Sequence, residues 1–289
     1  MRILVTNDDG IFSEGIHALA DAAAAIGSDV TVVAPDREQS ATSHSLTLHR
    51  PLRVRKVRPG WYSVDGTPTD CVNMALNGLL KDARPDLVVS GINLGPNLGD
   101  DVTYSGTVSA TFEANLYGIP AVAFSLDVDR DVSFTRAGLI AQRVIAQFID
   151  TLLDAEPPAR DDEGRAHRDL LLNVNLPPGV PKGFRFTTLS RRYYQQNVVE
   201  KRDPRGRRYY WIAGTPAWDA PEGTDQHAVL EGYVSLTPLH LDLTDHGGKA
   251  RYAPLRTRLD AVGLPDDLPA APDDENGADA ADKTADADT

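Results

Sequence analysis

The chain has 289 residues, a single cysteine and a formal net charge of −13 at pH 7, from 29 Lys and Arg against 42 Asp and Glu. One cysteine, Cys71, excludes an intrachain disulfide scaffold and a cysteine-rich zinc module, and the excess of acids argues against general affinity for DNA, RNA or anionic membranes. Neither a bilayer-spanning apolar run nor a signal-peptide pattern is present, so we expect a soluble cytoplasmic protein with no membrane partner.

The first 35 residues predict a strand, a helix and a second strand. Residues 2–6 form a short apolar run typical of a buried parallel strand. A helical pattern covers Glu14–Ile26 and Gly27 ends it, as a C-terminal glycine does. Residues 29–34 are the next apolar strand. Two strands joined by a helix form a right-handed parallel unit, so we expect a parallel sheet.

The same alternation continues to about residue 180. Residues 46–65 alternate apolar and polar side chains around Pro59-Gly60, which predicts a hairpin. Thr67-Pro68 is typical of an N-cap followed by proline, and opens a helix to about Lys81. The remaining predicted elements are strands at 86–90, 120–125 and 170–175, helices at 107–117 and 134–154, and a glycine-rich loop from Gly91 to Gly106. We therefore predict an α/β fold, a Rossmann-like open and mostly parallel sheet, as the core over residues 1–180.

The C-terminal third has a different character. Residues 181–262 predict a smaller β-rich extension, with strand candidates at 184–189, 208–213 and 231–236 and a helix near 248–262. Residues 263–289 form an acidic, Ala- and Pro-rich tail that lacks the apolar surface to fold alone, so we expect disorder. A docking role for this tail is the alternative.

Polar side chains follow three of the predicted strands. The first strand ends in Asn7-Asp8-Asp9-Gly10, the second loop contains Ser40, and strand 86–90 is followed by Asn93. Ligands bind at the carboxyl ends of parallel strands, and adjacent carboxylates repel unless a cation compensates them. Two carboxylates, a hydroxyl and an amide are hard oxygen donors, which suit Mg²⁺, Mn²⁺ or Ca²⁺ rather than structural zinc. This edge therefore predicts a divalent metal site.

The segment Tyr104-Ser105-Gly106-Thr107-Val108 predicts an anion site beside it. Ser105 is placed to cap the following helix, and free N–H groups at a helix N-terminus bind phosphate. A metal next to a phosphate site indicates metal-assisted hydrolysis of a phosphate ester.

Each motif also has an ordinary structural interpretation. Asp-Asp-Gly alone is most often a turn, and Gly-Thr after a serine is most often a helix cap. Asp100-Asp101 could be ligands, but a solvated acidic loop is more common. His44 lies in the second loop and could face the substrate or stand behind the metal ligands. The chain lacks a P-loop, a GxGxxG fingerprint and a Gly-x-Ser-x-Gly elbow.

Together these residues resemble the SurE family of stationary-phase survival phosphatases. The matching segments are RILVTNDDG, APDREQSATSHSLTL, GTPTDCVNMAL, PDLVVSGINLGPNLGDDVTYSGTVSAT, DPRGRRYYW and GTDQHAVLEGYVSLTPLHLDLT, which cover about residues 1–255 in order. The resemblance implies a metal-dependent nucleoside monophosphate phosphatase acting on 5′- and often 3′-nucleotides. Some members of the family also shorten polyphosphate.

The resemblance assigns roles by position. It implies one Mg²⁺ or Mn²⁺ per subunit held by Asp8, Asp9, Ser40 and Asn93, with Asp8 and Asp9 catalytic. It implies a phosphate cradle made of Asn97, Ser105, Gly106 and Thr107. It also implies homodimers or homotetramers in which C-terminal segments, within 181–262, exchange between subunits.

Three departures from the family and one rival function remain. Ala41 stands where the family commonly has glycine, and an alanine would be strained if that position needs a positive φ. The insertion at 156–168 and the tail after about residue 262 are the other two departures. The rival function is a non-catalytic, metal-dependent nucleotide- or phosphate-binding module, whose metal and anion site would have the same sequence.

Overall fold

The computed structural model describes residues 1–27, 29–128, 132–154, 170–195, 198–212 and 215–262. The predicted insertion at 156–168 and the predicted acidic tail lie outside these residues. The chain divides into two compact units, Met1–Leu241 and a second that starts at Asp242. Among the described residues, no helix combines the length and apolar character needed to span a membrane.

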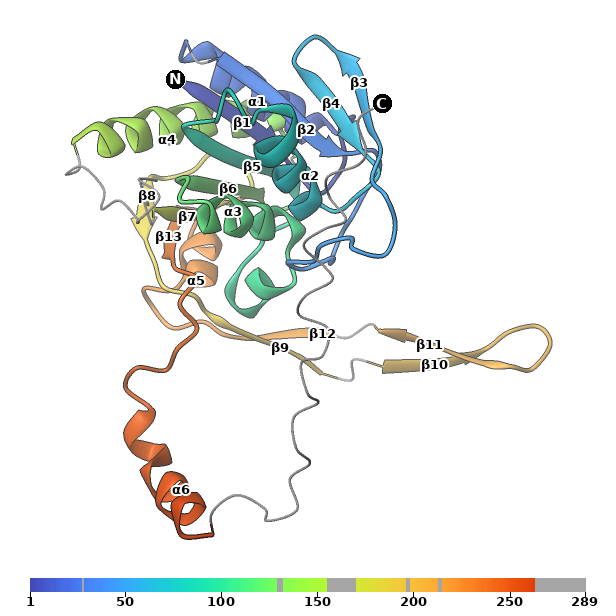
Figure 1. The fold of residues 1–289 in the computed structure, drawn as a ribbon, viewed down its shortest axis with the longest axis vertical. Coiled ribbons are helices and arrows are strands. Elements are labelled where there is room, and N and C mark those ends of the chain that lie inside the picture. The colour runs from blue at the N-terminus through green and yellow to red at the C-terminus, as the bar shows by residue number, and fades with distance from the viewer. Residues whose placement is uncertain (28, 129–131, 155–169, 196–197, 213–214, 263–289) are drawn as a thin grey trace, which may run out of the picture. The chain divides into compact units, whose positions relative to one another are not determined.

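Nine strands of the described chain form one sheet, in the order β3-β4-β2-β1-β5-β6-β7-β13-β8 (Figure 1). The six strands β4, β2, β1, β5, β6 and β7 run parallel to one another. The edge strand β3 pairs antiparallel with β4, and β13 pairs antiparallel with β7. The strands are β1 (Arg2–Thr6), β2 (Asp29–Pro35), β3 (Val54–Arg58), β4 (Trp61–Val64), β5 (Leu87–Leu94), β6 (Ala121–Leu126), β7 (Leu171–Leu176), β8 (Phe184–Phe186) and β13 (Val234–Leu239). The predicted Rossmann-like, mostly parallel sheet is confirmed.

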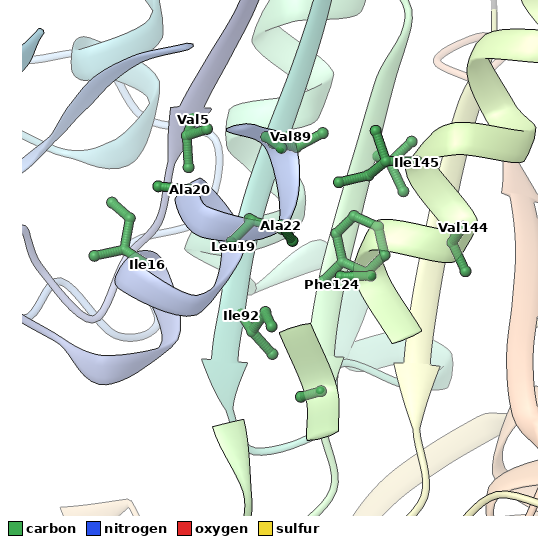
Figure 2. Close-up of a cluster of buried hydrophobic side chains, with 14 of the residues drawn as sticks. Val5, Ile16, Leu19, Ala20, Ala22, Val89, Ile92, Phe124, Val144 and Ile145 are labelled. Atoms are coloured by element: carbon green, nitrogen blue, oxygen red, sulfur yellow. The ribbon is translucent and has the colours of Figure 1, made fainter. Parts of the chain in front are cut away.

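Helices cover both faces of this sheet. Residues of α1 (Glu14–Ala25) and α4 (Phe134–Asp154) share one buried apolar cluster with Val5 of β1. Residues of α2 (Pro68–Met74) and α3 (Gly106–Leu116) share the other with Leu4. Figure 2 shows the first cluster, in which side chains of α1 and α4 lie over strand residues that include Val89 and Phe124. Neighbouring residues of a strand, such as Leu4 and Val5, therefore pack into apolar clusters on opposite faces of the sheet, because strand side chains alternate between faces.

The sequence signals for the end of α1 and the start of α2 are confirmed. Gly27 follows α1 with a φ of 77°. Thr67 and Asp70 form a reciprocal capping box with Pro68 in the first turn of α2. The helical segment ends at Leu79, close to the predicted end near Lys81, but it is an α-helix only to Met74 and a π-helical turn, Ala75–Leu79, follows.

The predicted glycine-rich loop from Gly91 is also wrong at its start. Strand β5 continues to Leu94, and its pairing with β6 shifts register between Ser90 and Asn93. Asn93 pairs with Ser125 of β6 after that shift. The neighbouring strand supplies hydrogen-bonding partners that extend β5 through the glycine, so Asn93 is held within a sheet rather than in a free loop.

The part beyond residue 180 contributes to the main sheet and also forms two small antiparallel pairs. Strand β9 (Arg191–Gln195) pairs with β12 (Thr215–Asp219), and β10 (Val198–Arg202) pairs with β11 (Arg208–Ile212). The predicted strand at 208–213 matches β11, whereas the prediction at 231–236 is displaced from β13 and that at 184–189 is longer than β8. Strands β9, β10 and β12 and helix α5 (Asp225–Leu230) were not predicted. In the second unit, α6 (Lys249–Val262) matches its prediction.

Candidate functional site

The carboxylates of Asp8 and Asp9 lie at the carboxyl end of β1. Asp8 is 4% exposed, and its Oδ1 accepts a hydrogen bond from the hydroxyl of Thr107 on α3. Asp9 is half-buried, and its Oδ2 accepts a hydrogen bond of 3.1 Å from the Leu94 N–H at the end of β5. The pair therefore touches both the helix and the strand that the sequence predicted beside it.

Burial is the main influence on both acids. It raises the pKa of Asp8 to about 6, with the charge of Asp9 adding to this rise and the Thr107 hydrogen bond opposing it. Burial also raises the pKa of Asp9, and the charge of Glu38 raises it further against the Leu94 hydrogen bond. No Lys or Arg of the described chain forms an ion pair with either carboxylate that would offset this cost.

Backbone hydrogen bonds tie the second loop to the first and to the α3 entrance. The Gln39 N–H donates to the Asp8 carbonyl at 2.8 Å, and the Ser43 N–H donates to the Tyr104 carbonyl at 3.1 Å. Ser40 is exposed, and its hydroxyl donates to Oε1 of Glu38 at 2.7 Å. That bond turns the proton of Ser40 toward Glu38 and leaves the hydroxyl oxygen as a ligand atom.

The position that departs from the family does have a positive φ. Ala41 has a φ of 56°, and Ser43 has one of 55°. Both lie in the left-handed region, which costs a non-glycine residue about 1–2 kcal/mol. The strain expected for an alanine at this position is therefore present in the loop that carries Ser40.

Asn93 and Asn97 are fixed by different partners. The side-chain amide of Asn93 donates to the Gly95 carbonyl at 2.8 Å, which makes Oδ1 the atom that a cation would use. Asn97 is buried at the ends of β6 and β7. Its backbone N–H donates to Oδ1 of Asn175 and its side-chain amide donates to the Ser125 hydroxyl, each at 2.8 Å, while its carbonyl accepts from Asn173 at 2.8 Å. Asn173 and Asn175 were not predicted; two asparagines inside the apolar run 170–176 are the signal that could have found them.

The N-terminus of α3 packs directly on Asp8. The Ser105 hydroxyl accepts the Val108 N–H at 3.1 Å, so the predicted N-cap is confirmed. A Cβ added to Gly106 would lie 2.9 Å from Cβ and 3.0 Å from Oδ2 of Asp8. Only glycine allows the helix backbone to come this close to the carboxylate.

His44 is held by a carboxylate that the sequence analysis did not identify. Its Nε2 lies 2.9 Å from Oε2 of Glu113, which is buried on α3 two turns after the candidate cradle. Asn73 of α2 donates to the other oxygen of Glu113 at 3.0 Å. The ring of His44 also meets Phe112 edge to face. These contacts fix the ring between the second loop and α3.

The donor set suits a hard divalent cation. One buried and one half-buried carboxylate without a basic partner, an amide oxygen and a hydroxyl are the ligand types that Mg²⁺ and Mn²⁺ take. Among the described residues there is no cluster of three or more His, Cys, Asp or Glu arranged for a metal. A site here would therefore rely on the amide and hydroxyl oxygens as well as on the two acids.

This is a Rossmann-like α/β protein in which paired strand-end carboxylates lie against a helix N-terminus. The family described as "Survival protein SurE" matches residues 3–196. The chain belongs to the SurE family.

Similar proteins cover almost the same length. Proteins named "5′-nucleotidase SurE" from Syntrophotalea carbinolica and Geobacter sulfurreducens are each 53% identical to 85% of this chain, covering 93% and 90% of their own lengths. The crystal structure of the Sure protein from Aquifex aeolicus is 42% identical, with a TM-score of 0.73, over 89% of this chain and 100% of that one. The similarity thus extends over most of the chain.

Proposed function

We propose that this chain is a phosphomonoesterase that hydrolyses nucleoside 5′-monophosphates to nucleoside and phosphate, and that it uses one Mg²⁺ or Mn²⁺ per subunit. The observation that carries the proposal is the contact of the buried Asp8 carboxylate with Gly106 and Thr107 at the start of α3. A cation at these acids would sit beside helix N–H groups that bind phosphate. The 5′-nucleotidase name of the similar proteins supports the choice of substrate.

One group of residues would bind the metal and another would bind the phosphate. Asp8, Asp9, Ser40 and Asn93 would hold the cation, which when bound supplies Lewis-acid polarisation of the phosphoryl group and a more acidic water. Asn97, the Ser105 and Thr107 hydroxyls and the Gly106 N–H orient the phosphate oxygens and meet the charge that develops on them. Asp8 or Asp9 orients the attacking water. His44, which Glu113 fixes, would contact the nucleoside or stand behind the metal ligands.

We further propose a substrate range, an oligomeric state and a cellular location for this protein. Hydrolysis of 3′-monophosphates and shortening of polyphosphate extend the substrate range, while DNA and RNA duplexes and membranes are not partners. A homodimer or homotetramer forms through segments within residues 181–262, a range that also supplies β8 and β13 to the main sheet. The chain works in the cytoplasm, as its single cysteine favours.

The test is phosphate release from 5′- and 3′-monophosphates and polyphosphate, with Mg²⁺, with Mn²⁺ and with EDTA. Asp8→Asn keeps the shape of the side chain and should reduce release by a hundredfold or more, on the order of a lost metal ligand or transition-state group. Asp21→Asn on the exposed face of α1 is the matched control and should behave as wild type. Metal-dependent release that Asp8→Asn abolishes supports the proposal. Saturable nucleotide binding without release by folded, metal-loaded protein contradicts it and favours the binding module.

A further inference from the structure

The candidate phosphate-binding residues lie on one segment, 97–107, whose two ends are hydrogen-bonded at the carboxyl edge of the sheet. Asn97 is bound to β6 and β7, and Thr107 is bound to Asp8. Between them runs a short 3₁₀ turn, η2 (Gly99–Thr103), outside the sheet. A segment of this kind keeps its side chains in place only if other parts of the fold hold its middle.

Asp225, at the start of α5, holds the first residue of that turn. Its carboxylate is fully buried, and Oδ2 accepts the Gly99 N–H at 2.8 Å. The other oxygen accepts the Ser190 N–H at 2.8 Å. A Cβ on Gly99 would lie 2.6 Å from the Ser190 carbonyl oxygen, so the two backbones are in direct contact. Asp225 thus joins the turn to the connection between β8 and β9.

Arg192, in β9, holds the next two residues. Its backbone N–H donates to Oδ2 of Asp100 at 2.8 Å, and its guanidinium forms an ion pair with Asp101. The side chains of Arg192 and Asp101 are only 17% and 18% exposed, so solvent screens this pair less than a surface pair. The guanidinium also lies 4.7 Å from the ring centre of Trp218 in β12, which limits its movement.

The backbone of Asp101 connects this anchor to the helix entrance. Its carbonyl accepts the Tyr104 N–H at 2.9 Å and the Ser105 N–H at 3.1 Å. Ser105 in turn caps α3 through Val108. A continuous set of contacts therefore runs from the guanidinium of Arg192 through Asp101 to Ser105.

We infer that Arg192 and Asp225 are positioning residues for phosphate binding, which hold the middle of segment 97–107 from the C-terminal third of the chain. The inference deepens the proposed function and rests on it for its kinetic test. Neither residue touches the substrate. Their effect is on where Ser105 and Gly106 lie when phosphate arrives, so it falls on binding of substrate and product more than on the chemical step.

The experiment compares Arg192→Ala with Arg191→Ala, its exposed neighbour on the other face of β9. In the full-length protein loaded with Mn²⁺, Arg192→Ala should raise KM for a nucleoside 5′-monophosphate roughly tenfold or more with kcat within about threefold, as displaced positioning groups do. Inhibition by inorganic phosphate should weaken by the same factor. Arg191→Ala should change neither. Unchanged KM and phosphate inhibition in Arg192→Ala would overturn the inference.

A double variant separates positioning from general loss of structure. If Arg192 acts through Asp101, the variant carrying both Arg192→Ala and Asp101→Ala should have the KM of the worse single variant, whereas independent effects would multiply. Multiplied effects overturn the pathway through Asp101. Asp225→Asn retains the shape of the side chain but removes its negative charge and one of its two acceptor oxygens. It should raise KM in the same way. An Asp225→Asn protein that folds with unchanged KM overturns its role.

Amide hydrogen exchange gives a measurement that does not depend on activity. Arg192→Ala should speed exchange at Tyr104 and Ser105, whose N–H groups bond to Asp101, and leave the β1 amides unchanged. If the wild type releases no phosphate but these amides respond, the proposed function fails and the positioning contacts stand. If the wild type is active and the amides and KM do not respond, the positioning inference fails alone.

Discussion

The hydroxyl of Thr107 donates a hydrogen bond to Oδ1 of Asp8, which lies 99 residues earlier in the chain. This bond joins the end of the first strand to the first turn of α3, and so connects the candidate metal ligands to the candidate phosphate cradle. Both residues are buried, so the hydrogen bond is shielded from water and its loss is costly.

Replacing Thr107 tests that connection. Thr107→Val keeps the shape but removes the hydroxyl, and we expect kcat/KM to fall about a hundredfold, as on loss of one preorganised donor. Thr107→Ser keeps the hydroxyl and should retain most activity. Steady-state kinetics on a nucleoside 5′-monophosphate measures both. Equal activities of the two variants would contradict a role for the hydroxyl.

Gly106→Ala tests the closeness of the helix to the carboxylate. The added Cβ would lie 2.9 Å from the Cβ of Asp8 and 3.1 Å from Pro68, so α3 must shift. A displacement near 1 Å costs about a hundredfold in rate. Gly78→Ala is the control, because its new Cβ would meet no atom closer than 4.0 Å. The expected result is lost phosphatase activity in Gly106→Ala alone, and activity retained there would show that the close approach is not needed.

The positive φ of Ala41 predicts a stabilising substitution. Ala41→Gly should raise the free energy of unfolding by about 0.5–1 kcal/mol, since relief of left-handed strain exceeds the extra entropy of the unfolded glycine. Ala24→Gly, on the exposed side of α1, should lower it by about 1 kcal/mol. Urea unfolding measures both changes. Destabilisation by both glycines would mean that Ala41 is not strained.

The raised pKa of Asp8 predicts how the metal-free protein responds to pH. The folded chain holds a proton there up to about pH 6, while an unfolded aspartate releases it near 3.8. Stability should therefore fall as pH rises through this window, by about 3 kcal/mol at most. In EDTA, Asp8→Asn should remove this part of the fall and be more stable than wild type at pH 7. Urea unfolding from pH 4 to 7 measures it, with Asp21→Asn as control, and parallel curves for wild type and Asp8→Asn would refute it.

Metal addition should reverse the order of stability of wild type and Asp8→Asn. At pH 7, Mn²⁺ at a hundred times its dissociation constant should stabilise wild type by about 2.7 kcal/mol, because it binds only the folded site. Asp8→Asn should gain much less. A thermal shift that is equal in both proteins would place the metal elsewhere.

The contact between His44 and Glu113 predicts a substrate-dependent effect. If His44 lies against the nucleoside, His44→Ala should raise KM for nucleotides about fivefold, the equivalent of about 1 kcal/mol for one contact. Phenyl phosphate, which has no nucleoside, should be hydrolysed as before. His17→Ala, whose ring stacks on Trp61, is the control. An equal loss on both substrates would assign His44 to the phosphate or metal instead.

The parallel core and the candidate residues at its edge could be predicted from sequence patterns alone. Apolar runs and helical periodicity are local, and parallel strands bring their carboxyl ends to one edge, so Asp8 and Asn93 could be placed together in advance. The caps at Thr67 and Ser105 were predictable because each involves residues only three positions apart.

The distant segments that support that edge could be identified only from the packed fold. Asp225 binds Gly99 across 126 residues, His44 meets Glu113 across 69, and β13 joins β7 from beyond the predicted core. Strands β9 and β10 were missed because their residues lack an alternating apolar face against a core. A local pattern records which face of an element is apolar, but not which buried N–H groups elsewhere need an acceptor, and that need is satisfied only when the chain packs.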